Sequence, residues 1–468
     1  MILPRLAMAT VYNRSIMTAT TAAERSAPSA GDVQASRPLD RTAWRALLAA
    51  ACGWLFDGYE TYALILVGAA AIRELVPPDQ LVQLPLYFGG LVAVTLVGWA
   101  TGGLVGGVLT DYLGRRRMLM LAVLCYAVFT GMSALAHTYW MLLIFRFLTG
   151  LGLGGEFCPG AALVSELWPP ARRGRAAGAL ASAFGFGSLL AAGLWFLVGT
   201  VGDGSWRYLF VIGILPALVV FWMRRGVADP VVWVATDRRR QAARQAARAG
   251  RSLSEEERRL TRFTVLDLFA SGELRRRTLL LLMMALSTIV GYWAVSTWIP
   301  QYATQVATRA GFGADGWGAR AGLVYSAGGI VGYLALGFMA DAWGRKPSIA
   351  FFFAGSLVVG AAPFLVSTNL PVFLAVVALN GFFTTGQFAW LAMYPPEVYP
   401  TAVRGTGTAV VFNSARYVAA LGPLAAGWLV ESVGGIARAA VMMSAIYLLG
   451  LIVTPFAAPE TRGRPLPD

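Results

Sequence analysis

The segment GVLTDYLGRRR at residues 107–117 decides the fold, because it recurs as GFMADAWGRK at residues 337–346. Gly, Asp, Gly and Arg keep the same spacing in both copies, and Asp111 and Asp341 are 230 positions apart. Apolar stretches lie before and after each copy. Each copy is therefore expected to form a tight polar loop between two antiparallel helices, with glycine permitting the turn.

A second pair of motifs repeats in the same register. Glu166 precedes Arg173 by seven positions, and Glu397 precedes Arg404 by the same seven, which places the second pair 231 positions after the first. Two independent matches at nearly one offset indicate that the chain consists of two similar halves.

Long apolar stretches place these halves in a membrane. The chain has 468 residues, of which 57% are hydrophobic and 13% charged, whereas a soluble chain carries roughly a quarter charged residues. A helix that crosses a bilayer needs about 20 apolar residues. We predict twelve such helices, at residues 46–72, 84–109, 118–137, 139–166, 176–200, 207–223, 278–304, 320–340, 348–367, 371–395, 405–431 and 436–456. The expected fold is an all-α membrane protein with twelve transmembrane helices in two pseudo-symmetric six-helix bundles.

Polar segments divide the chain into regions. Residues 45–223 and 278–457 are the expected N-terminal and C-terminal bundles, and residues 224–277 are a cytoplasmic linker that we interpret as solvated. Residues 1–44, rich in Ala, Ser and Thr, are expected to be a disordered cytoplasmic tail. Residues 458–468 form a second, short cytoplasmic tail.

The positive charge orients the chain in the membrane. Of the 38 Lys and Arg residues, 31 fall on the side that holds both predicted termini, five on the opposite side and two inside helices. Cytoplasmic loops carry such an excess, so both termini are expected in the cytoplasm, in the inner cell membrane. The net charge of +14 is explained by this surface, and we expect no nucleic-acid partner.

Few residues suit catalysis or metal binding. Cys52, Cys125 and Cys158 fall within predicted helices at spacings that match no metal site, and His137 is the only histidine. Lys346 is the only lysine, so a nucleotide-binding loop with its lysine is absent. We therefore expect no cofactor, no metal site and no catalytic residue, and interpret the protein as a membrane-embedded monomer and not as an enzyme.

Several motifs together resemble the major facilitator superfamily of transporters, over almost the whole chain after residue 44. They are the two repeated loops, RFLTGLGLGGE at 146–156, SELWP at 165–169 with RGR at 173–175, and PETRG at 459–463. Within that superfamily, FDGYE at 56–60, YW at 292–293, WIP at 298–300 and FNSAR at 412–416 resemble the metabolite:proton symporters. That group carries aromatic acids, nicotinate, sialate and similar organic anions. The resemblance implies two halves that rock around a site near the middle of the bilayer.

Acidic residues inside predicted helices are candidates for proton coupling, because a charge costs about 2.5–3.5 kcal/mol near the centre of a membrane helix. Asp57 and Glu60 share one helix face, and Asp57 lies roughly 18 Å beyond Arg45, near mid-depth. Burial and mutual repulsion favour protonation of such carboxyl groups. The family pattern implies a Glu60–Arg146 ion pair, which protonation of the acid would break. Glu156 is either a second proton site or a protonated group that holds helices together.

Arg416 is the candidate for substrate binding. It lies twelve positions after Arg404 and so roughly 18 Å deep, and its planar guanidinium matches a carboxylate. Asn413, on the same helix face, could add a hydrogen bond. Alternatively, Arg416 pairs with Asp57 or Glu156 and only holds the two halves together. Aromatic and amide side chains are expected to line the cavity with it, namely Tyr59, Tyr292, Trp293 and Gln387.

The repeated loops are expected to form a cytoplasmic gate. Its ion pairs would hold the halves together in one state and release them in the other. Alternatively, these charges only anchor the loops among lipid headgroups. The expected gate residues are Asp111, Arg115, Glu166 and Arg173 in the first half, and Asp341, Arg345, Glu397 and Arg404 in the second.

These observations predict a secondary active transporter. Its expected function is the proton-coupled symport, in the direction of uptake, of a small organic anion, a carboxylate, by alternating access. A proton-coupled carrier of sugars or polyols is the main alternative. A drug-type efflux antiporter fits poorly because Arg416 would repel a cationic drug, and a non-transporting receptor would not need two intact gating motifs.

Overall fold

The computed structural model describes residues 41–467 except for residues 200, 203, 219–228, 230, 262, 296–297, 314–315, 367, 423–431 and 435. Within these residues the chain is helical and contains no strand. The first half comprises α3 (Arg41–Leu75), α4 (Leu84–Leu113), α5 (Arg115–Ser133), α6 (Tyr139–Leu167), α7 (Arg173–Val198) and α8 (Trp206–Ile212). The linker then contributes α10 (Val231–Arg248) and two short helices, α11 (Glu255–Thr261) and α12 (Thr264–Asp267).

The second half repeats the arrangement with more interruptions. It comprises α13 (Gly272–Val295), α14 (Ile299–Arg309), α15 (Trp317–Trp343), α16 (Arg345–Val359), α17 (Ala362–Leu365), α18 (Leu370–Asn380), α19 (Ala389–Val398), α20 (Arg404–Ala419), α22 (Ile436–Ser444) and α23 (Ile446–Val453). A π-helical turn, η4 (Gly381–Thr385), and a 3-10 turn, η5 (Gly386–Phe388), join α18 to α19. Such turns are often found at functional sites.

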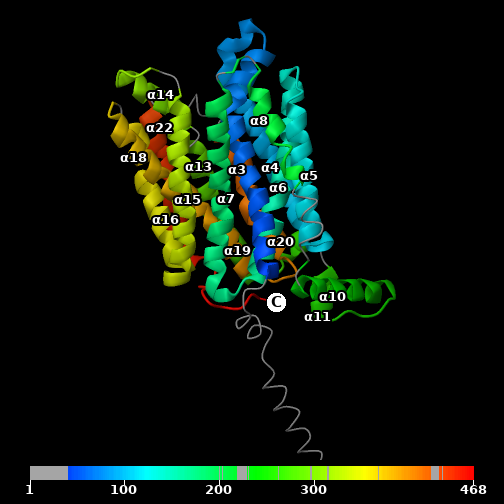
Figure 1. The fold of residues 1–468 in the computed structure, drawn as a ribbon. Helices are drawn as coiled ribbons and strands as arrows, with labels where there is room; N and C mark the ends of the chain where they lie inside the picture. Colours follow the sequence, from blue (N-terminus) through cyan, green and yellow to red (C-terminus); the bar gives the residue numbers. More distant parts are fainter. Residues whose placement is uncertain are drawn as a thin grey trace, which may run out of the picture.

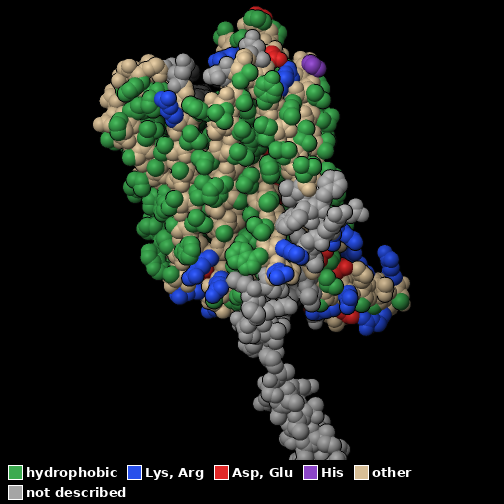
Figure 2. All heavy atoms as spheres, viewed as in Figure 1, with side chains coloured by type: hydrophobic (Ala, Val, Ile, Leu, Met, Phe, Trp, Pro, Cys, Tyr) green, Lys and Arg blue, Asp and Glu red, His purple; other side chains and the backbone are tan. Residues whose placement is uncertain are grey.

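The helices form two bundles that stand side by side (Figure 1). Among the described residues, ten helices are long and apolar enough to cross a membrane. The other two predicted spans, at residues 207–223 and 405–431, extend into residues that the structure does not describe. Hydrophobic side chains cover the sides of the molecule, and Lys and Arg gather near the end where α10 projects (Figure 2). We call this end the linker end.

The two repeated loops make the turns that their glycines predict. Gly114 separates α4 from α5 with φ of 96°, and Gly344 separates α15 from α16 with φ of 111°. Side chains rarely tolerate this backbone conformation, whereas glycine adopts it freely. The loops therefore lie at equivalent positions in the two halves, both at the linker end.

Small residues bring the helices close enough to position the central side chains. A Cβ on Gly154 of α6 would lie 2.0 Å from the carbonyl oxygen of Trp99 on α4, and a Cβ on Gly102 would lie 2.0 Å from that of Leu151. This contact between small residues is the usual packing of membrane helices. Between the halves, α4 packs on α20 and α7 packs on α15.

Candidate functional site

The first half contains a buried ion pair at the predicted proton site. Glu60 on α3 accepts a hydrogen bond from Nη1 of Arg146 on α6 at 3.2 Å, and each side chain is only 1% exposed. The guanidinium also donates to Ser133 Oγ at 2.8 and 3.0 Å and to Thr149 Oγ1 at 3.1 Å. Its centre lies 4.4 Å from the ring of Phe210. Arg146 therefore stays solvated by hydroxyl groups, which would support its charge if Glu60 became protonated.

A pair of buried acids lies one helical turn from Glu60. Asp57 on α3 and Glu156 on α6 lie close enough to influence each other electrostatically, and both are buried. The carboxyl group of Glu156 fills the space above Gly53, where a Cβ would lie 1.7 Å from Glu156 Oε1. Tyr126 on α5 borders the same pair. Two neighbouring carboxylates buried in a medium of low dielectric constant repel each other, which favours protonation of one of them.

Arg416 lies on α20 in the second half, at the aromatic centre of the molecule. Its guanidinium is 3.9 Å from the ring centroid of Phe412 and 4.4 Å from that of Trp99. Nη1 donates to Phe412 O and to Asn413 Oδ1, both at 2.9 Å, and Nε, although buried, has no hydrogen-bond partner among the described residues. No carboxylate of the described residues forms an ion pair with this group. The pairing of Arg416 with Asp57 or Glu156 is therefore not formed in this state.

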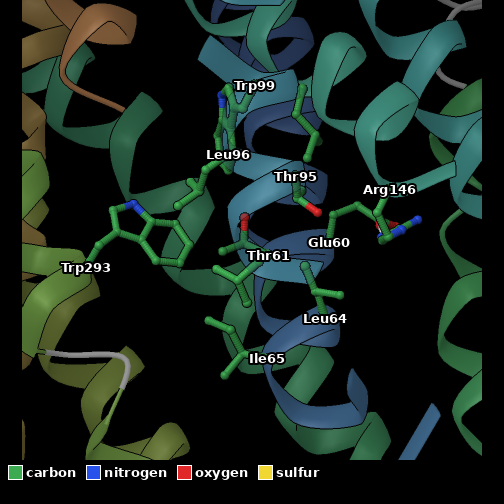
Figure 3. Close-up of a pocket in the computed structure, with 11 residues that line it drawn as sticks. Glu60, Thr61, Leu64, Ile65, Thr95, Leu96, Trp99, Arg146 and Trp293 are labelled. Carbon is green, nitrogen blue, oxygen red and sulfur yellow. Dashed lines mark hydrogen bonds and ion pairs between the residues drawn. The ribbon is translucent and has the colours of Figure 1, made fainter. Parts of the chain in front are cut away.

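Two small cavities meet at the boundary between the halves. One, of about 20 Å³, reaches Arg416 between aromatic side chains that include Trp54, Tyr292 and Trp293. The other, of about 10 Å³, reaches Glu60 and Arg146. Trp99 and Trp293 line both cavities. Figure 3 shows the second cavity, with Trp293 on one side and the Glu60–Arg146 pair on the other. Each cavity holds roughly one water molecule, so it must widen to admit a larger solute.

The predicted substrate residues divide into two groups. Arg416, Tyr292 and Trp293 line the first cavity. Asn413 does not; its amide orients Arg416 and donates to Ala409 O at 3.1 Å. Tyr59 points to α8, where its hydroxyl donates to Leu209 O at 2.7 Å.

Gln387 also lies outside both cavity walls. It is buried in the 3-10 turn η5, and within the part of the chain that the structure describes neither polar atom of its amide has a hydrogen-bond partner. The sequence could not place these side chains, because small rotations of a helix decide which residue faces the cavity.

The predicted gate residues lie at the linker end, where several of them join the halves. Asp111 accepts hydrogen bonds from the backbone N–H of Gly405 at 3.2 Å and of Thr406 at 2.8 Å, and so caps the N-terminus of α20 in the other half. Asp341 caps α7 in the same way, from the N–H groups of Gly174 and Arg175, both at 3.0 Å. A carboxylate at a helix N-terminus satisfies unpaired N–H groups and the helix dipole.

The arginines of the gate are arranged less symmetrically. Glu166 accepts from Arg115 at 3.1 Å and, across the halves, from Arg404 at 2.7 Å. Glu397 is bound by Arg345 at 2.7 Å, within its own half.

Arg173 forms no corresponding ion pair with a carboxylate of the described residues. It donates to backbone carbonyls of Ser165, Trp168 and Arg464. The inter-half contacts close this end of the molecule.

The linker supplies a contact with both halves that the sequence did not indicate. Arg240 on α10 is 2% exposed. Its Nη1 donates to Asp111 O at 2.5 Å, and its Nη2 donates to Ala402 O at 2.9 Å, so one side chain spans both halves. Among the many arginines of this segment, no spacing distinguishes Arg240. The expectation of a solvated linker is wrong for this residue.

Two helical bundles around a central polar site, closed at one end by contacts between the halves, define a membrane transporter of the major facilitator type. The family model described as "Sugar (and other) transporter" matches residues 45–468, and the chain belongs to this family. It is therefore a multi-pass membrane protein and not an enzyme.

Similar proteins include carriers of small metabolites. A putative metabolite transport protein of Haemophilus influenzae is 31% identical over 90% of this chain and 98% of its own length. A cis,cis-muconate transport protein of Acinetobacter baylyi is 29% identical over 77% of this chain and 82% of its own length. The solved structure of the proton:xylose symporter XylE bound to 6-bromo-6-deoxy-D-glucose superposes with a TM-score of 0.71, at 20% identity, over 92% of this chain and 98% of the other. At that identity it supports the fold alone.

Proposed function

We propose that this transporter takes up a small organic anion, a carboxylate, together with protons, by alternating access in the inner cell membrane with both termini in the cytoplasm. The proposal rests on the environment of Arg416. A buried guanidinium borders an aromatic cavity without an ion pair to any carboxylate of the described residues. A carboxylate substrate would supply the missing counter-charge, with two donors of the guanidinium matching its two oxygens.

The acids of the first half supply the proposed proton site. Asp57, Glu156 and the Glu60–Arg146 pair are all buried, and Trp99 and Trp293 link the Glu60–Arg146 cavity to the Arg416 cavity. An anion at Arg416 adds negative charge nearby and thereby favours protonation of the acids. By the same coupling, a proton on the acids favours anion binding. Movement of either alone would leave an uncompensated charge in the membrane.

Transport into proteoliposomes tests this proposal. We expect accumulation of a radiolabelled carboxylate, with cis,cis-muconate among the first candidates because it is named for a relative, when the outside is more acidic than the inside. Dissipating the pH gradient with a protonophore should abolish accumulation but should not affect the exchange of internal for external substrate. Accumulation that is insensitive to the pH gradient would contradict proton coupling.

A neutral sugar or polyol is the second candidate substrate. The buried amide of Gln387 and the hydroxyl of Tyr447 have no hydrogen-bond partner and could bind hydroxyl groups after a rearrangement. Competition distinguishes the two candidates: unlabelled carboxylates should block uptake of the labelled carboxylate, and xylose should not. The reverse result would favour the sugar carrier.

A further inference from the structure

A pocket at the linker end lies outside the transport pathway. It has a volume of about 380 Å³ and is formed where α13 begins and the last span ends, beside the start of α16. This volume is within the range of small-molecule sites. It is far larger than the central cavities of about 10 and 20 Å³. Nothing in the proposed transport cycle uses it.

The wall of this pocket is positively charged. Arg276 is exposed, Lys346 donates from Nζ to Pro455 O at 2.7 Å, and Arg277 pairs with Glu273. Glu273 is the one carboxylate on the wall, so the wall has a net positive charge. The nearby Glu460 carboxylate is turned toward the backbone N–H groups of Arg345 and Lys346, at 2.9 and 3.0 Å. The positive end of the α13 dipole points the same way.

The position of the pocket matches the level of lipid headgroups. Phe456, 62% exposed, ends the candidate membrane span Ala437–Phe456 and lines the pocket. Arg276 lies in the first turns of the span Gly272–Val295. The pocket thus joins an apolar, lipid-facing side chain to cations at the boundary of the apolar surface. A free phosphate ion would form ion pairs with the cations but would make no apolar contact with the exposed phenyl ring.

We propose that this pocket binds the phosphate headgroup of an anionic phospholipid from the cytoplasmic leaflet. Arg276 and Lys346 contact the phosphate, and Phe456 packs against the acyl chains. Basic pockets between membrane helices on the cytoplasmic side recognise such headgroups. Because its walls come from α13, the start of α16 and the end of the last span, the bound lipid ties together three segments of the second bundle.

The single lysine provides a direct test. Lys346 is the only lysine, so an uncharged amine-reactive reagent followed by peptide mass spectrometry reports on this pocket. The full chain is labelled in nanodiscs of phosphatidylcholine, with and without phosphatidylglycerol. We expect phosphatidylglycerol to slow labelling of Lys346 roughly tenfold when it is present at about ten times its dissociation constant. Arg276→Ala should remove most of this protection.

Arg275→Ala is the matched control, because Arg275 is exposed on the same turn of α13 but does not line the pocket. It should keep the protection. Equal loss in both variants would show a diffuse surface charge and overturn the proposal. Equal labelling in both lipids would also overturn it. Protection by inorganic phosphate in detergent, at the strength of phosphatidylglycerol, would assign the pocket to a soluble anion instead. The melting temperature of each variant checks that it is folded.

Discussion

At the scale of single residues, buried charge decides where function can lie. Arg416 is held in place by Phe412 and Asn413, while its Nε has no partner. Burying an arginine inside a membrane span costs free energy. Its fixed orientation means that little side-chain entropy is lost when a ligand binds. These features are the reason why we propose that Arg416 recognises the carboxylate.

Replacement of Arg416 by lysine should weaken carboxylate binding about 10- to 100-fold, because the ammonium cannot form the two parallel hydrogen bonds and each charged hydrogen bond contributes about 1.5–3 kcal/mol. Isothermal titration or substrate-induced thermal shift measures the affinity. Arg309→Lys, an exposed position at the end of α14, is the control and should bind normally. Unchanged affinity of Arg416→Lys would reject the assigned role.

Asp57→Asn and Glu156→Gln should uncouple transport from protons, since each amide keeps the shape of the carboxyl group but cannot be ionised. We expect accumulation driven by a pH gradient to be lost, while exchange of internal for external substrate is retained. Glu74→Gln is the control, because Glu74 lies at the end of α3, the helix that carries Asp57, and pairs near the surface with Arg207. Loss of exchange together with accumulation would point to a structural defect.

At the scale of secondary-structure elements, short polar contacts join helices that are distant in sequence. Asp111 and Asp341 cap helices of the opposite half, and Arg240 joins the end of α4 to the loop before α20. In this structure these contacts hold the linker end closed. The linker helix α10 should therefore affect the equilibrium between the closed and open states of this end.

Arg240→Ala should loosen the gate, because it removes two hydrogen bonds that span the halves. We expect faster hydrogen exchange at the backbone amides of Gly405 and Thr406, which donate to Asp111. Arg244→Ala is the matched control: Arg244 lies on the same helix and stacks on Tyr112, but is exposed. Identical exchange in the wild type and Arg240→Ala would show that α10 does not stabilise the closed gate.

Glu460 plays a capping role at the start of α16. Burial raises the pKa of its carboxyl group, but the N–H groups of Arg345, Lys346 and Arg462 outweigh this and hold the pKa below its ordinary value. A lowered folded-state pKa means that the contribution to stability is complete above the ordinary carboxyl range and is lost as the pH falls through the lowered value.

Glu460→Gln should accordingly lower the melting temperature by a few degrees at neutral pH. The melting temperature of the variant should also fall less than that of the wild type when the pH is lowered. Thermal unfolding between neutral and acidic pH measures both effects. Glu255→Gln, on the linker helix α11, serves as a control. If the melting temperature of Glu460→Gln falls with pH as much as that of the wild type, another carboxylate causes the loss of stability in acid.

At the scale of the whole molecule, the two capping aspartates at the linker end are arranged symmetrically, and the charged residues at the centre are not. Equivalent loops in the two halves close one end. The embedded acids Asp57, Glu60 and Glu156 belong to the first half and the unpaired Arg416 to the second. In the proposed alternating-access cycle, movement of one half against the other would therefore act on both proposed sites at once.

This division predicts that substrate and proton bind cooperatively. The rise in melting temperature caused by a saturating carboxylate should be greatest at acidic pH and should decrease as the pH increases, because the protonated acids no longer repel the anion. Glu156→Gln should flatten this dependence. A thermal shift that is independent of pH in the wild-type protein would contradict the coupling.

The sequence by itself determined the class of protein, because apolar length and the repeated loops are local properties. It also supplied the embedded charges and, through the family pattern, the Glu60–Arg146 pair that the structure contains. The tertiary structure decided which of these side chains meet. It placed Asn413 behind Arg416, turned Tyr59 toward α8, gave Glu166 two arginine partners and buried Arg240 between the halves. These outcomes depend on the rotation and approach of helices far apart in the chain, which no local spacing specifies.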